Sequence, residues 1–351
     1  MNREAKIYVA GHSGLVGSAL VRNLRAKGYS KILSCSQGDL DLTNQQAVND
    51  FFRSEQPEYV FLAAARVGGI LANSTYSAQF IYDNLSIATN VVDASFRTGV
   101  KKLLNLGSSC IFPRLAEQPL KESSLLTGPL EQTNEAYAVA KIAAIKLCRY
   151  YNEQYGTNFM SVMPTNLYGP GDNFDLEKSH VLPALVRKFH LAKLLSENKV
   201  DDLREDMLRR SIGFGKKASN SADKVELESL LGSIGVTGRQ VTLWGTGAPY
   251  REFLYVDDLA EACIFLMEKY DAKDVGEFIN IGFGSDITIK DAAALVRNAI
   301  GFTGDIAFDA TKPDGTPRKL LDSTRINKLG WNPKIRLADG IKLEYEWYLS
   351  H

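Results

Sequence analysis

Tyr137 and Lys141 are the side chains whose types and spacing first suggest chemistry. Because four positions separate them, a helix places the phenol and the ammonium on one face, within reach of each other. Gly107-Ser108-Ser109 ends an earlier strand-like run, and parallel sheets bind ligands at the carboxyl ends of their strands. With Ser108, the pair predicts proton transfer to a substrate oxygen. Lys141 would lower the pKa of Tyr137, the general acid, and hold a nicotinamide ribose. The alternative is an exposed Tyr-Lys pair on a solvated helix.

A thiol and an imidazole form a second candidate pair. Cys110 directly follows the serines, and beside a nucleotide site its thiol would be activated by nearby cations to act as a base. His180 lies in the loop that leads into the second half of the chain. The alternatives stay open, because a lone cysteine is usually a small buried hydrophobe and a lone histidine is more often structural than catalytic.

The cysteines are too widely separated to indicate a metal site. No C-x-x-C pair and no histidine at ligand spacing accompanies them, so we predict no metal and reduced thiols. The four are Cys35, Cys110, Cys148 and Cys263.

A glycine-rich turn follows the first apolar run, Ile7–Ala10, and precedes a helical pattern. Gly11 permits a tight turn, Gly14 lets the backbone approach a pyrophosphate, and Gly17 allows close packing of helix on sheet. The helix N-terminus adds N–H donors and positive potential. The turn, Gly11-His12-Ser13-Gly14-Leu15-Val16-Gly17, therefore predicts a dinucleotide site. The alternative is a glycine-rich turn that binds nothing.

The choice between NAD and NADP depends on the end of the second strand. An acidic residue there accepts the ribose 2′-hydroxyl of NAD, whereas arginine suits the 2′-phosphate of NADP. Neither type follows the run that ends at Ser34: Ser36 and Gln37 are neutral, and the next acids, Asp39 and Asp41, come only after Gly38. Ser13, Ser36 and Gln37 are able to hydrogen-bond either form.

The elements that must position these residues alternate as expected for an α/β fold. Short apolar runs without polar alternation predict buried parallel strands, and helical patterns separate them. A basic last turn and Gly28 end the first helix, and Thr43 is expected to cap the next, which runs through Arg53. We predict a Rossmann-type doubly wound parallel sheet with a smaller C-terminal substrate-binding lobe. The predicted strands are 7–10, 31–34, 59–63, 102–106 and 159–163.

The rhythm changes after Pro164, where turn-rich sequence leads to a helix over 181–195. Residues 1–165 are expected to form the dinucleotide-binding domain, with segments from about 240–285 returning to it in part. The substrate-binding lobe is expected over 166–351. Polar residues 196–239 interrupt the pattern with weak helical stripes, and we interpret them as a surface insertion.

Composition limits the possible partners. The 351 residues include 41 basic and 41 acidic side chains, so no global field attracts nucleic acid. No apolar run is long enough to cross a membrane and the N-terminus lacks a signal-like stretch, which predicts a cytoplasmic protein. Two strongly apolar helical segments, 81–96 and 138–151, suggest a homodimer, the alternative being burial against the chain's own sheet.

The ordered motifs resemble the GDP-L-fucose synthases, which are GDP-4-keto-6-deoxy-D-mannose 3,5-epimerase-4-reductases of the extended short-chain dehydrogenase/reductases. The similarity covers nearly the whole chain. It rests on the glycine turn, Ala63–Ile70, Gly107–Pro113, Tyr137-x-x-x-Lys141, Pro164-Thr165-Asn166-Leu167-Tyr168-Gly169-Pro170, Trp244-Gly245, Arg251-Glu252-Phe253-Leu254 and Lys312–Lys319.

The resemblance implies a role for each matching position. Tyr137, Lys141 and Ser108 would form the reductase triad, and Cys110 and His180 the acid/base pair of epimerisation. A GDP-4-keto sugar would be the substrate, NADP(H) the cofactor and a dimer the assembly, with NAD(H) also open. The implied cofactor contacts are the glycine turn, Ser36, Gln37, Asp41, Leu42, Ala64, Lys141, Pro164, Asn166, Leu167 and His180. The implied substrate contacts are Ser109, Asn166, Lys188, Trp244, Arg251, Asp314 and Lys319.

Three departures from the family pattern affect these expectations. The family's arginines for a 2′-phosphate are replaced by Ser13 and by the neutral strand end. Lys188 stands where arginine is frequent, and lysine does not reproduce arginine's two-pronged hydrogen bonding. The insertion at 196–239 resembles one in relatives that act on GDP-heptoses, so the 4-keto sugar is either a 6-deoxyhexose or a heptose.

Two rival interpretations remain. A sugar-nucleotide 4-epimerase or 4,6-dehydratase shares the fold, but a dehydratase would carry an Asp-Glu pair where Cys110 and Ile111 stand. A non-catalytic nucleotide sensor or scaffold would also share it, although such proteins can lose the Tyr-Lys pair that this chain keeps.

Overall fold

The computed structural model describes residues 1–351, apart from the side chains of Ile70 and Leu71. It divides into two compact units, each made of three chain segments. The first unit comprises Met1–Leu167, Glu252–Ser285 and Leu320–Ile335, and the second comprises Tyr168–Arg251, Asp286–Lys319 and Arg336–His351.

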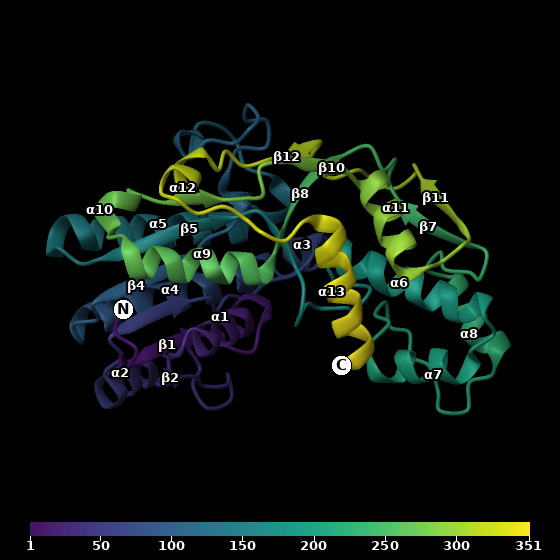
Figure 1. The fold of residues 1–351 in the computed structure, drawn as a ribbon, viewed down its shortest axis with the longest axis horizontal. Helices are drawn as coiled ribbons and strands as arrows, with labels where there is room; N and C mark the ends of the chain where they lie inside the picture. Colours follow the sequence, from purple (N-terminus) through teal and green to yellow (C-terminus); the bar gives the residue numbers. More distant parts are fainter. The chain divides into compact units, whose positions relative to one another are not determined.

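The first unit is built on a six-stranded sheet in which every neighbouring pair is parallel (Figure 1). Its strand order is β2-β1-β3-β4-β5-β9. This order reverses direction at β1, where a doubly wound sheet binds its ligand. The strands are β1 (Ile7–Ala10), β2 (Ile32–Leu33), β3 (Tyr59–Leu62), β4 (Lys102–Leu106), β5 (Phe159–Pro164) and β9 (Ile279–Ile281).

Alternate residues of β1 pack on opposite faces of this sheet. Ile7 and Val9 join a core formed with α1 (Leu15–Ala26) and α9 (Val256–Lys269). Tyr8 and Ala10 join the core of the opposite face. That second core is built with α2 (Gln45–Glu55), α4 (Ser77–Arg97) and α5 (Glu135–Tyr155). The prediction of a doubly wound α/β sheet is confirmed. The unit also holds α3 (Ile70–Thr75), α10 (Ala272–Val275), α12 (Thr324–Lys328) and the short 3-10 helices η1 (Ser109–Ile111), η2 (Glu122–Ser124) and η3 (Gln132–Asn134).

The second helix begins one residue later than predicted. Asn44, not Thr43, is its N-cap, and the Asn44 side chain accepts a hydrogen bond from the backbone N–H of Ala47. Thr43 instead donates its hydroxyl to Asp41 at 2.8 Å. The competing Asp41 contact explains why the predicted cap was wrong.

The second unit combines two small sheets with five helices. β7 (Gln240–Trp244) pairs in parallel with β11 (Asp305–Asp309), and β8 (Tyr250–Tyr255) lies between β10 (Asp286–Thr288) and β12 (Arg318–Lys319). Two strands, β6 (Asn166–Tyr168) and β8, carry the chain from one unit to the other. The helices are α6 (Val181–Ser196), α7 (Val200–Arg209), α8 (Lys224–Gly232), α11 (Ile289–Ile300) and α13 (Leu337–Ser350).

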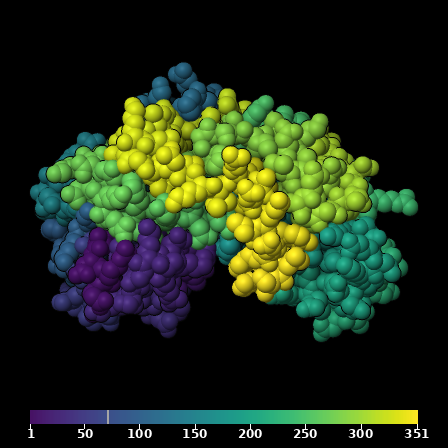
Figure 2. Space-filling view, in the orientation of Figure 1, coloured from purple at the N-terminus to yellow at the C-terminus, as the bar shows by residue number. Residues whose placement is uncertain are grey.

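The interpretation of 196–239 as a surface insertion was incomplete, because the segment has a core of its own. Leu203, Leu227 and Leu231 are fully buried, and α7 packs on α6. In Figure 2 the C-terminal helix lies beside this teal segment. A backbone carbonyl of that helix, at Tyr348, accepts a hydrogen bond from Arg210.

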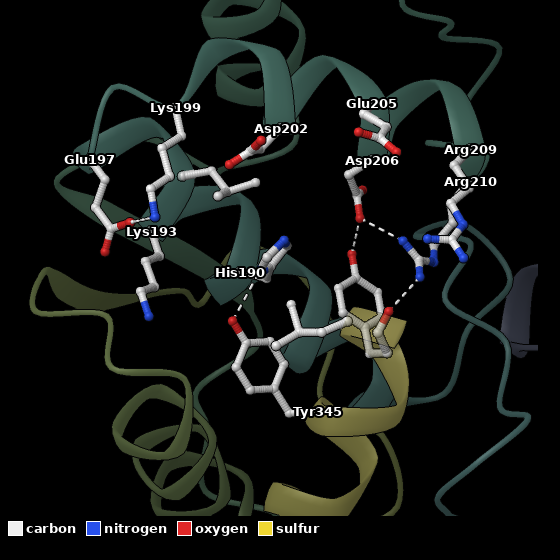
Figure 3. Close-up of a pocket in the computed structure, with 13 residues that line it drawn as sticks. His190, Lys193, Glu197, Lys199, Asp202, Glu205, Asp206, Arg209, Arg210 and Tyr345 are labelled. Atoms are coloured by element: carbon white, nitrogen blue, oxygen red, sulfur yellow. Dashed lines mark hydrogen bonds and ion pairs between the residues drawn. The ribbon is translucent and has the colours of Figure 1, made fainter. Parts of the chain in front are cut away.

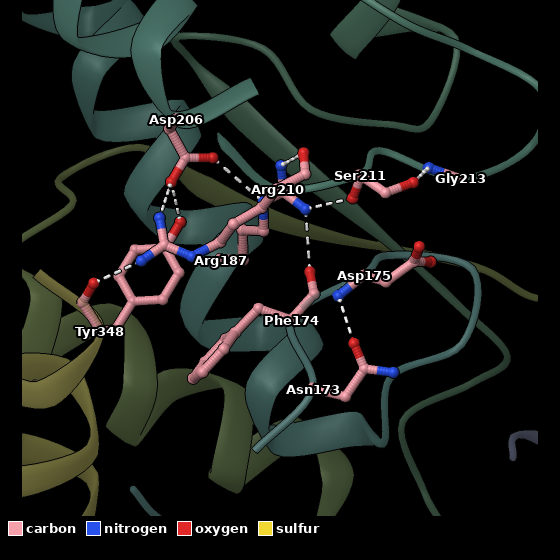
Figure 4. Close-up of polar contacts among 9 residues, drawn as sticks. All are labelled: Asn173, Phe174, Asp175, Arg187, Asp206, Arg210, Ser211, Gly213 and Tyr348. Atoms are coloured by element: carbon pink, nitrogen blue, oxygen red, sulfur yellow. Dashed lines mark hydrogen bonds and ion pairs between the residues drawn. The ribbon is translucent and has the colours of Figure 1, made fainter. Parts of the chain in front are cut away.

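One buried arginine fastens the insertion to the rest of the second unit. Arg187 of α6 has no exposed surface and pairs with Asp206 of α7 at 3.1 Å (Figure 4). Its guanidinium also donates to the carbonyls of Phe174 at 2.9 Å and Arg210 at 2.8 Å. All of these partners are groups that would be costly to bury unpaired.

The described part of the chain has neither a membrane-spanning helix nor a clustered metal site. None of its helices is both long and apolar enough to traverse a bilayer. It also holds no group of three or more histidine, cysteine, aspartate or glutamate side chains arranged to bind a metal ion.

Candidate active site

The glycine turn leaves no room for side chains at two of its positions. A Cβ on Gly11, which has φ +81°, would lie 2.7 Å from the backbone of Ala64. A Cβ on Gly17 would lie 2.0 Å from the carbonyl oxygen of Gly11. Gly11 is required by its positive φ and by the backbone that follows β3. Gly17 is required because α1 packs directly on the turn.

The start of α1 suits an anionic group. Its N-cap is Gly14, which has no side chain to accept from the first N–H groups, and its first turn holds no acid. The Nδ1 atom of His12 is buried with no hydrogen-bond partner in the described residues. Free helix N–H groups and an unpartnered imidazole nitrogen fit the diphosphate of a dinucleotide.

The predicted reductase residues lie together in the first unit. The Ser108 hydroxyl hydrogen-bonds the phenol of Tyr137 and accepts from the backbone N–H of Cys110 at 3.4 Å. Lys141, on the next turn of α5, donates its Nζ to the carbonyl of Leu106 at 2.8 Å and lies 5.8 Å from the centre of the Tyr137 ring. Strand β4 and helix α5 therefore supply one connected cluster.

Burial sets the proton affinities of this cluster. It lowers the pKa of Lys141 to about 8. Burial is the main cause that raises the pKa of Tyr137, the neighbouring Cys110 adds to it electrostatically, and the Ser108 hydrogen bond only partly offsets this. Lys141 is not among the groups that shift the phenol pKa here, where burial is the largest cause, so its lowering of that pKa stays a prediction. Both side chains favour their neutral forms more than exposed ones would.

The thiol of Cys110 belongs to the same cluster. Cys110 is in η1, which Ser108 caps, and only 7% of its surface is exposed. Its neighbour Ser109, a predicted substrate contact, is also buried. Cys110 acts electrostatically on both Tyr137 and Lys141. Cys110 is therefore buried, as a small hydrophobic residue would be, and it also lies beside Tyr137 and Lys141, as a catalytic base would.

Asn166 has a fixed partner in the first unit. Its side-chain amide donates to the backbone carbonyl of Glu252 at 2.8 Å, and Pro164 ends the buried strand β5 just before it. Leu167 is half-buried against the first unit's core. The predicted cofactor contacts at this sheet edge are thereby held by β5 and by the first residue of the returning segment.

The predicted contacts after β2 differ in what they do. Leu42 is buried, and its carbonyl accepts from Asn90 of α4 at 2.9 Å. Asp41 accepts from both the backbone and the hydroxyl of Thr43. Gln37 is exposed. Leu42 and Asp41 thus shape the turn into α2.

His180, predicted for catalysis, belongs to the second unit. It is the N-cap residue of α6, and its carbonyl accepts the helical hydrogen bond from Ala184. Its side chain is exposed. The surrounding chain atoms and the positive charge of Lys319 lower the pKa of its imidazole, which favours the neutral ring near pH 7.

Five of the predicted substrate contacts belong to the second unit, and two of them stand on neighbouring strands. Arg251 of β8 stands beside Lys319 of β12 in parallel register. Asp314 accepts from the backbone and the hydroxyl of Thr246, at 2.9 and 2.7 Å, and acts electrostatically on Arg251. Trp244, at the end of β7, leaves 62% of its surface exposed. Two cations and an open aromatic face suit a diphosphate and a base.

Lys188 has a different environment from these residues. It donates its Nζ to the carbonyl of Ile234 at 3.1 Å, and burial lowers its pKa to about 8. The structure therefore ties Lys188 to the segment after α8.

A cavity of about 380 Å³ in the second unit includes none of the predicted site residues (Figure 3). It lies among α6, α7 and α13, and His190 and Tyr345 meet across it with Nδ1 and the phenol oxygen 2.9 Å apart. Most of its charged side chains already have partners, such as Lys199 with Glu197 at 2.8 Å. The cavity is a separate feature from the candidate site.

Glu252 and Arg187 are two of the buried charged residues that the sequence analysis did not single out. Glu252 is fully buried and accepts from the backbone N–H groups of Gly284 at 2.7 Å and Leu321 at 3.0 Å. Arg187 anchors the insertion. In both cases a second charged residue is adjacent, Arg251 before Glu252 and Lys188 after Arg187, so the sequence alone does not indicate which of the two is buried.

Comparison with known proteins identifies the family. The sequence matches the NAD dependent epimerase/dehydratase family over residues 7–207 and 211–282. It is 49% identical over 350 residues to GDP-L-fucose synthase 1 of Arabidopsis thaliana, an alignment that covers 100% of this chain and 95% of that protein. The chain belongs to the GDP-L-fucose synthase family. It is therefore an enzyme of the nicotinamide-dependent epimerase and reductase class.

Other members of the GDP-L-fucose synthase family and its structural relatives extend this assignment. The Escherichia coli K12 GDP-L-fucose synthase is 45% identical over 352 residues, covering 99% of this chain and 97% of that protein. A GDP-D-glycero-L-gluco-heptose synthase from Campylobacter jejuni, solved in the presence of NADPH, matches with a TM-score of 0.88 and 44% identity, covering 100% and 99% of the two chains. The relatives thus include proteins named for both kinds of GDP-sugar.

Proposed function

We propose that the chain converts a GDP-4-keto-6-deoxyhexose to GDP-L-fucose by 3,5-epimerisation and 4-reduction, with a reduced nicotinamide dinucleotide. The observation that carries the proposal is the cluster in which Ser108 hydrogen-bonds Tyr137 while Cys110 and Lys141 act on the same phenol. A reductase needs only the hydroxyls and the amine; the added thiol supplies a base for epimerisation. Sequence identity to GDP-L-fucose synthases supports the same activity.

The chemistry follows from a ketone at C4, which acidifies the C–H bonds at both C3 and C5. Cys110 removes a proton from each carbon in turn, and His180 returns a proton to the opposite face. Ser108 and Tyr137 donate hydrogen bonds to the C4 oxygen as it becomes an enolate. The bound dinucleotide supplies the hydride for C4. Tyr137 then gives its proton to the C4 oxygen, and Lys141 stabilises the resulting phenolate.

Substrate recognition is assigned to the second unit. Arg251 and Lys319 hold the diphosphate as two neighbouring cations, and Asp314 orients Arg251. Trp244 offers its exposed ring to the guanine base or sugar. Lys188 contributes a further donor near the insertion.

A GDP-4-keto-heptose is the second candidate substrate, favoured by the likeness to the Campylobacter jejuni heptose synthase. The deciding experiment is product analysis with GDP-4-keto-6-deoxy-mannose and its heptose analogue, each with NADPH and NADH. The proposal requires GDP-L-fucose from the first substrate and deuterium at C3 and C5 when the reaction runs in heavy water. Binding of cofactor without turnover of either sugar would support a nucleotide sensor instead.

We also propose that the enzyme is a cytoplasmic homodimer that pairs through α4 and α5. These helices pack on each other, yet Tyr82, Tyr150 and Tyr155 expose 67%, 54% and 49% of their surfaces. Large aromatic side chains exposed on a packed helix pair favour an interface there.

The dimer is tested by light scattering after size-exclusion chromatography. Tyr82→Glu combined with Tyr150→Glu is expected to halve the mass. Leu115→Glu is the matched control, because Leu115 is 86% exposed on a loop of the same unit. A wild-type monomer at micromolar concentration would refute the proposal.

A further inference from the structure

The turn after β2 folds an acidic side chain back to the strand end. Ser36 donates its hydroxyl to Oδ2 of Asp39 at 2.6 Å, and the backbone N–H groups of Asp39 and Leu40 both donate to the carbonyl of Ser36. Ser36 and Asp39, three positions apart in the sequence, are therefore in direct contact. In the sequence Asp39 comes five residues after Ser34, the end of the predicted strand run. In the structure its carboxylate contacts Ser36, the second residue after that run.

This acid is available to a ligand. Ser36 and Asp39 are both exposed, and Oδ1 of Asp39 accepts no hydrogen bond from the described residues. Asp41, the other acid of the turn, is engaged with Thr43. Ser36 therefore fixes the Asp39 carboxylate through Oδ2, while Oδ1 stays available to accept a hydrogen bond from a ligand.

The charges around the strand end are negative. Cys35 lies between β2 and the turn, and burial together with the charges of Asp39 and Glu55 raises the pKa of its thiol. The segments 11–17 and 34–41 contain no lysine or arginine. Arg66, which follows β3, is already bound to Asp83 at 2.7 Å and Gln79 at 2.8 Å.

We propose that Asp39, positioned by Ser36, selects a dinucleotide with a free ribose 2′-hydroxyl, so that this enzyme prefers NADH to NADPH. The inference rests on the dinucleotide site of the proposed function and specifies its ligand. A carboxylate at the end of the second strand accepts the 2′-hydroxyl of NAD(H), whereas a 2′-phosphate needs a cation there. The glycine turn and the start of α1 serve the diphosphate, which both dinucleotides share.

A 2′-phosphate at this strand end would face like charges. It brings close to two negative charges next to Asp39, without an arginine fork to bind its oxygens; Glu55 is paired with Lys6 at 3.7 Å. Like charges at close range disfavour binding, and the effect weakens with added salt. The preference should therefore be strongest at low ionic strength.

The test is equilibrium binding of NADH and NADPH to the purified full-length protein without sugar, followed by the fluorescence of the reduced nicotinamide. Wild type is expected to bind NADH at least about tenfold more tightly than NADPH at low salt. Ser36→Arg combined with Asp39→Asn is expected to reverse the ratio by supplying a cation and removing the acid.

Glu153→Gln is the matched control. Glu153 forms a surface pair with Arg149 in the last turn of α5, so its loss removes one carboxylate from the same unit without touching the β2 turn. The control should keep the wild-type ratio. Equal or tighter binding of NADPH by wild type, or an unchanged ratio in the double variant, would overturn the inference.

The same protein preparation separates this inference from the proposed function. If NADH binds preferentially and no GDP-4-keto sugar is turned over, the result supports the cofactor inference and contradicts the proposed activity. If the sugar is reduced only with NADPH and NADPH binds more tightly, the activity stands and the role of Asp39 falls.

Discussion

At the residue scale, the site combines two demands on buried groups. A phenol and an amine that carry no charge are easier to bury than their ions, and the raised pKa of Tyr137 and lowered pKa of Lys141 reflect this. The Ser108 hydroxyl opposes the shift at Tyr137 by stabilising its anion. Sequence spacing predicted that Tyr137 and Lys141 would lie together, but it contains no measure of burial, which decides the direction of both shifts.

Cys110→Ser should separate the two half-reactions. A serine hydroxyl is a far weaker base than a thiolate, so deuterium incorporation at C3 and C5 is expected to fall by ~10²–10⁴-fold. In the proposed mechanism direct 4-reduction depends on Tyr137 and Lys141, so it should keep most of its rate. Both activities are measured by mass spectrometry of products formed in heavy water.

Cys148→Ser provides the control for this variant. Cys148 is a buried thiol of α5, hydrogen-bonded to Ser161, and it has no assigned role in the reaction. Its replacement should leave both activities close to wild type. Parallel loss of epimerisation and reduction in Cys110→Ser would argue against a separate base.

At the element scale, hydrophobic periodicity and turn-forming residues predicted most of the strands and helices of the first unit. Apolar runs located β1, β3, β4 and β5, and the helix predicted over 181–195 is α6. The insertion was not predictable in the same way, because its leucines have only weak helical spacing and their burial depends on α6 and α13. Arg187 is an example, because its hydrogen-bond partners follow it by 19 to 24 residues or precede it by 13. Helical or strand periodicity does not reveal contacts over such separations.

Arg187→Met should destabilise the protein strongly. Methionine fills similar space but leaves Asp206 short of one partner and three carbonyls without a donor. Breaking a buried ion pair by removing one partner costs about 3–5 kcal/mol of the free energy of unfolding. Chemical denaturation measures this loss.

Arg209→Met is the matched comparison for the buried arginine. Arg209 ends α7 at an exposed position. Its replacement is expected to change the free energy of unfolding by no more than about 0.5 kcal/mol. Equal effects of the two substitutions would show that the Arg187 contacts do not hold the insertion in place.

At the scale of the whole molecule, each unit is assembled from distant parts of one chain. The predicted return to the first domain, about 240–285, is 252–285 in the structure, and a further segment, 320–335, joins the same unit. That segment is held by a backbone hydrogen bond from Leu120 to the carbonyl of Leu320 and by Asn280, whose amide donates to the carbonyl of Asp322 at 3.3 Å. Such pairings link residues about 40 to 200 positions apart and leave no periodic signal in the sequence.

Two buried carboxyl groups give the second unit a pH-dependent stability. Burial raises the pKa of Asp172 to about 7. Burial and the charge of Asp172 raise the pKa of Glu344 in α13, although the N–H of Gly169 partly offsets this. The folded protein therefore holds protons that the unfolded chain, with carboxyl pKa values near 4, has already released. Stability should fall as pH rises from about 4 to about 7 and then level off for Asp172, with a slope of up to ~1.4 kcal/mol per pH unit.

Asp172→Asn isolates this contribution, because an amide stays neutral in both states. Relative to wild type, the variant is expected to gain stability steadily between pH 5 and pH 7, as measured by denaturation at a series of pH values. Glu346→Gln is the control, since Glu346 lies on α13 two residues from Glu344 but is exposed. A difference between Asp172→Asn and wild type that is the same at every pH would mean that Asp172 is already ionised in the folded chain at pH 5. The two carboxylates would then have to be stabilised by groups other than a bound proton.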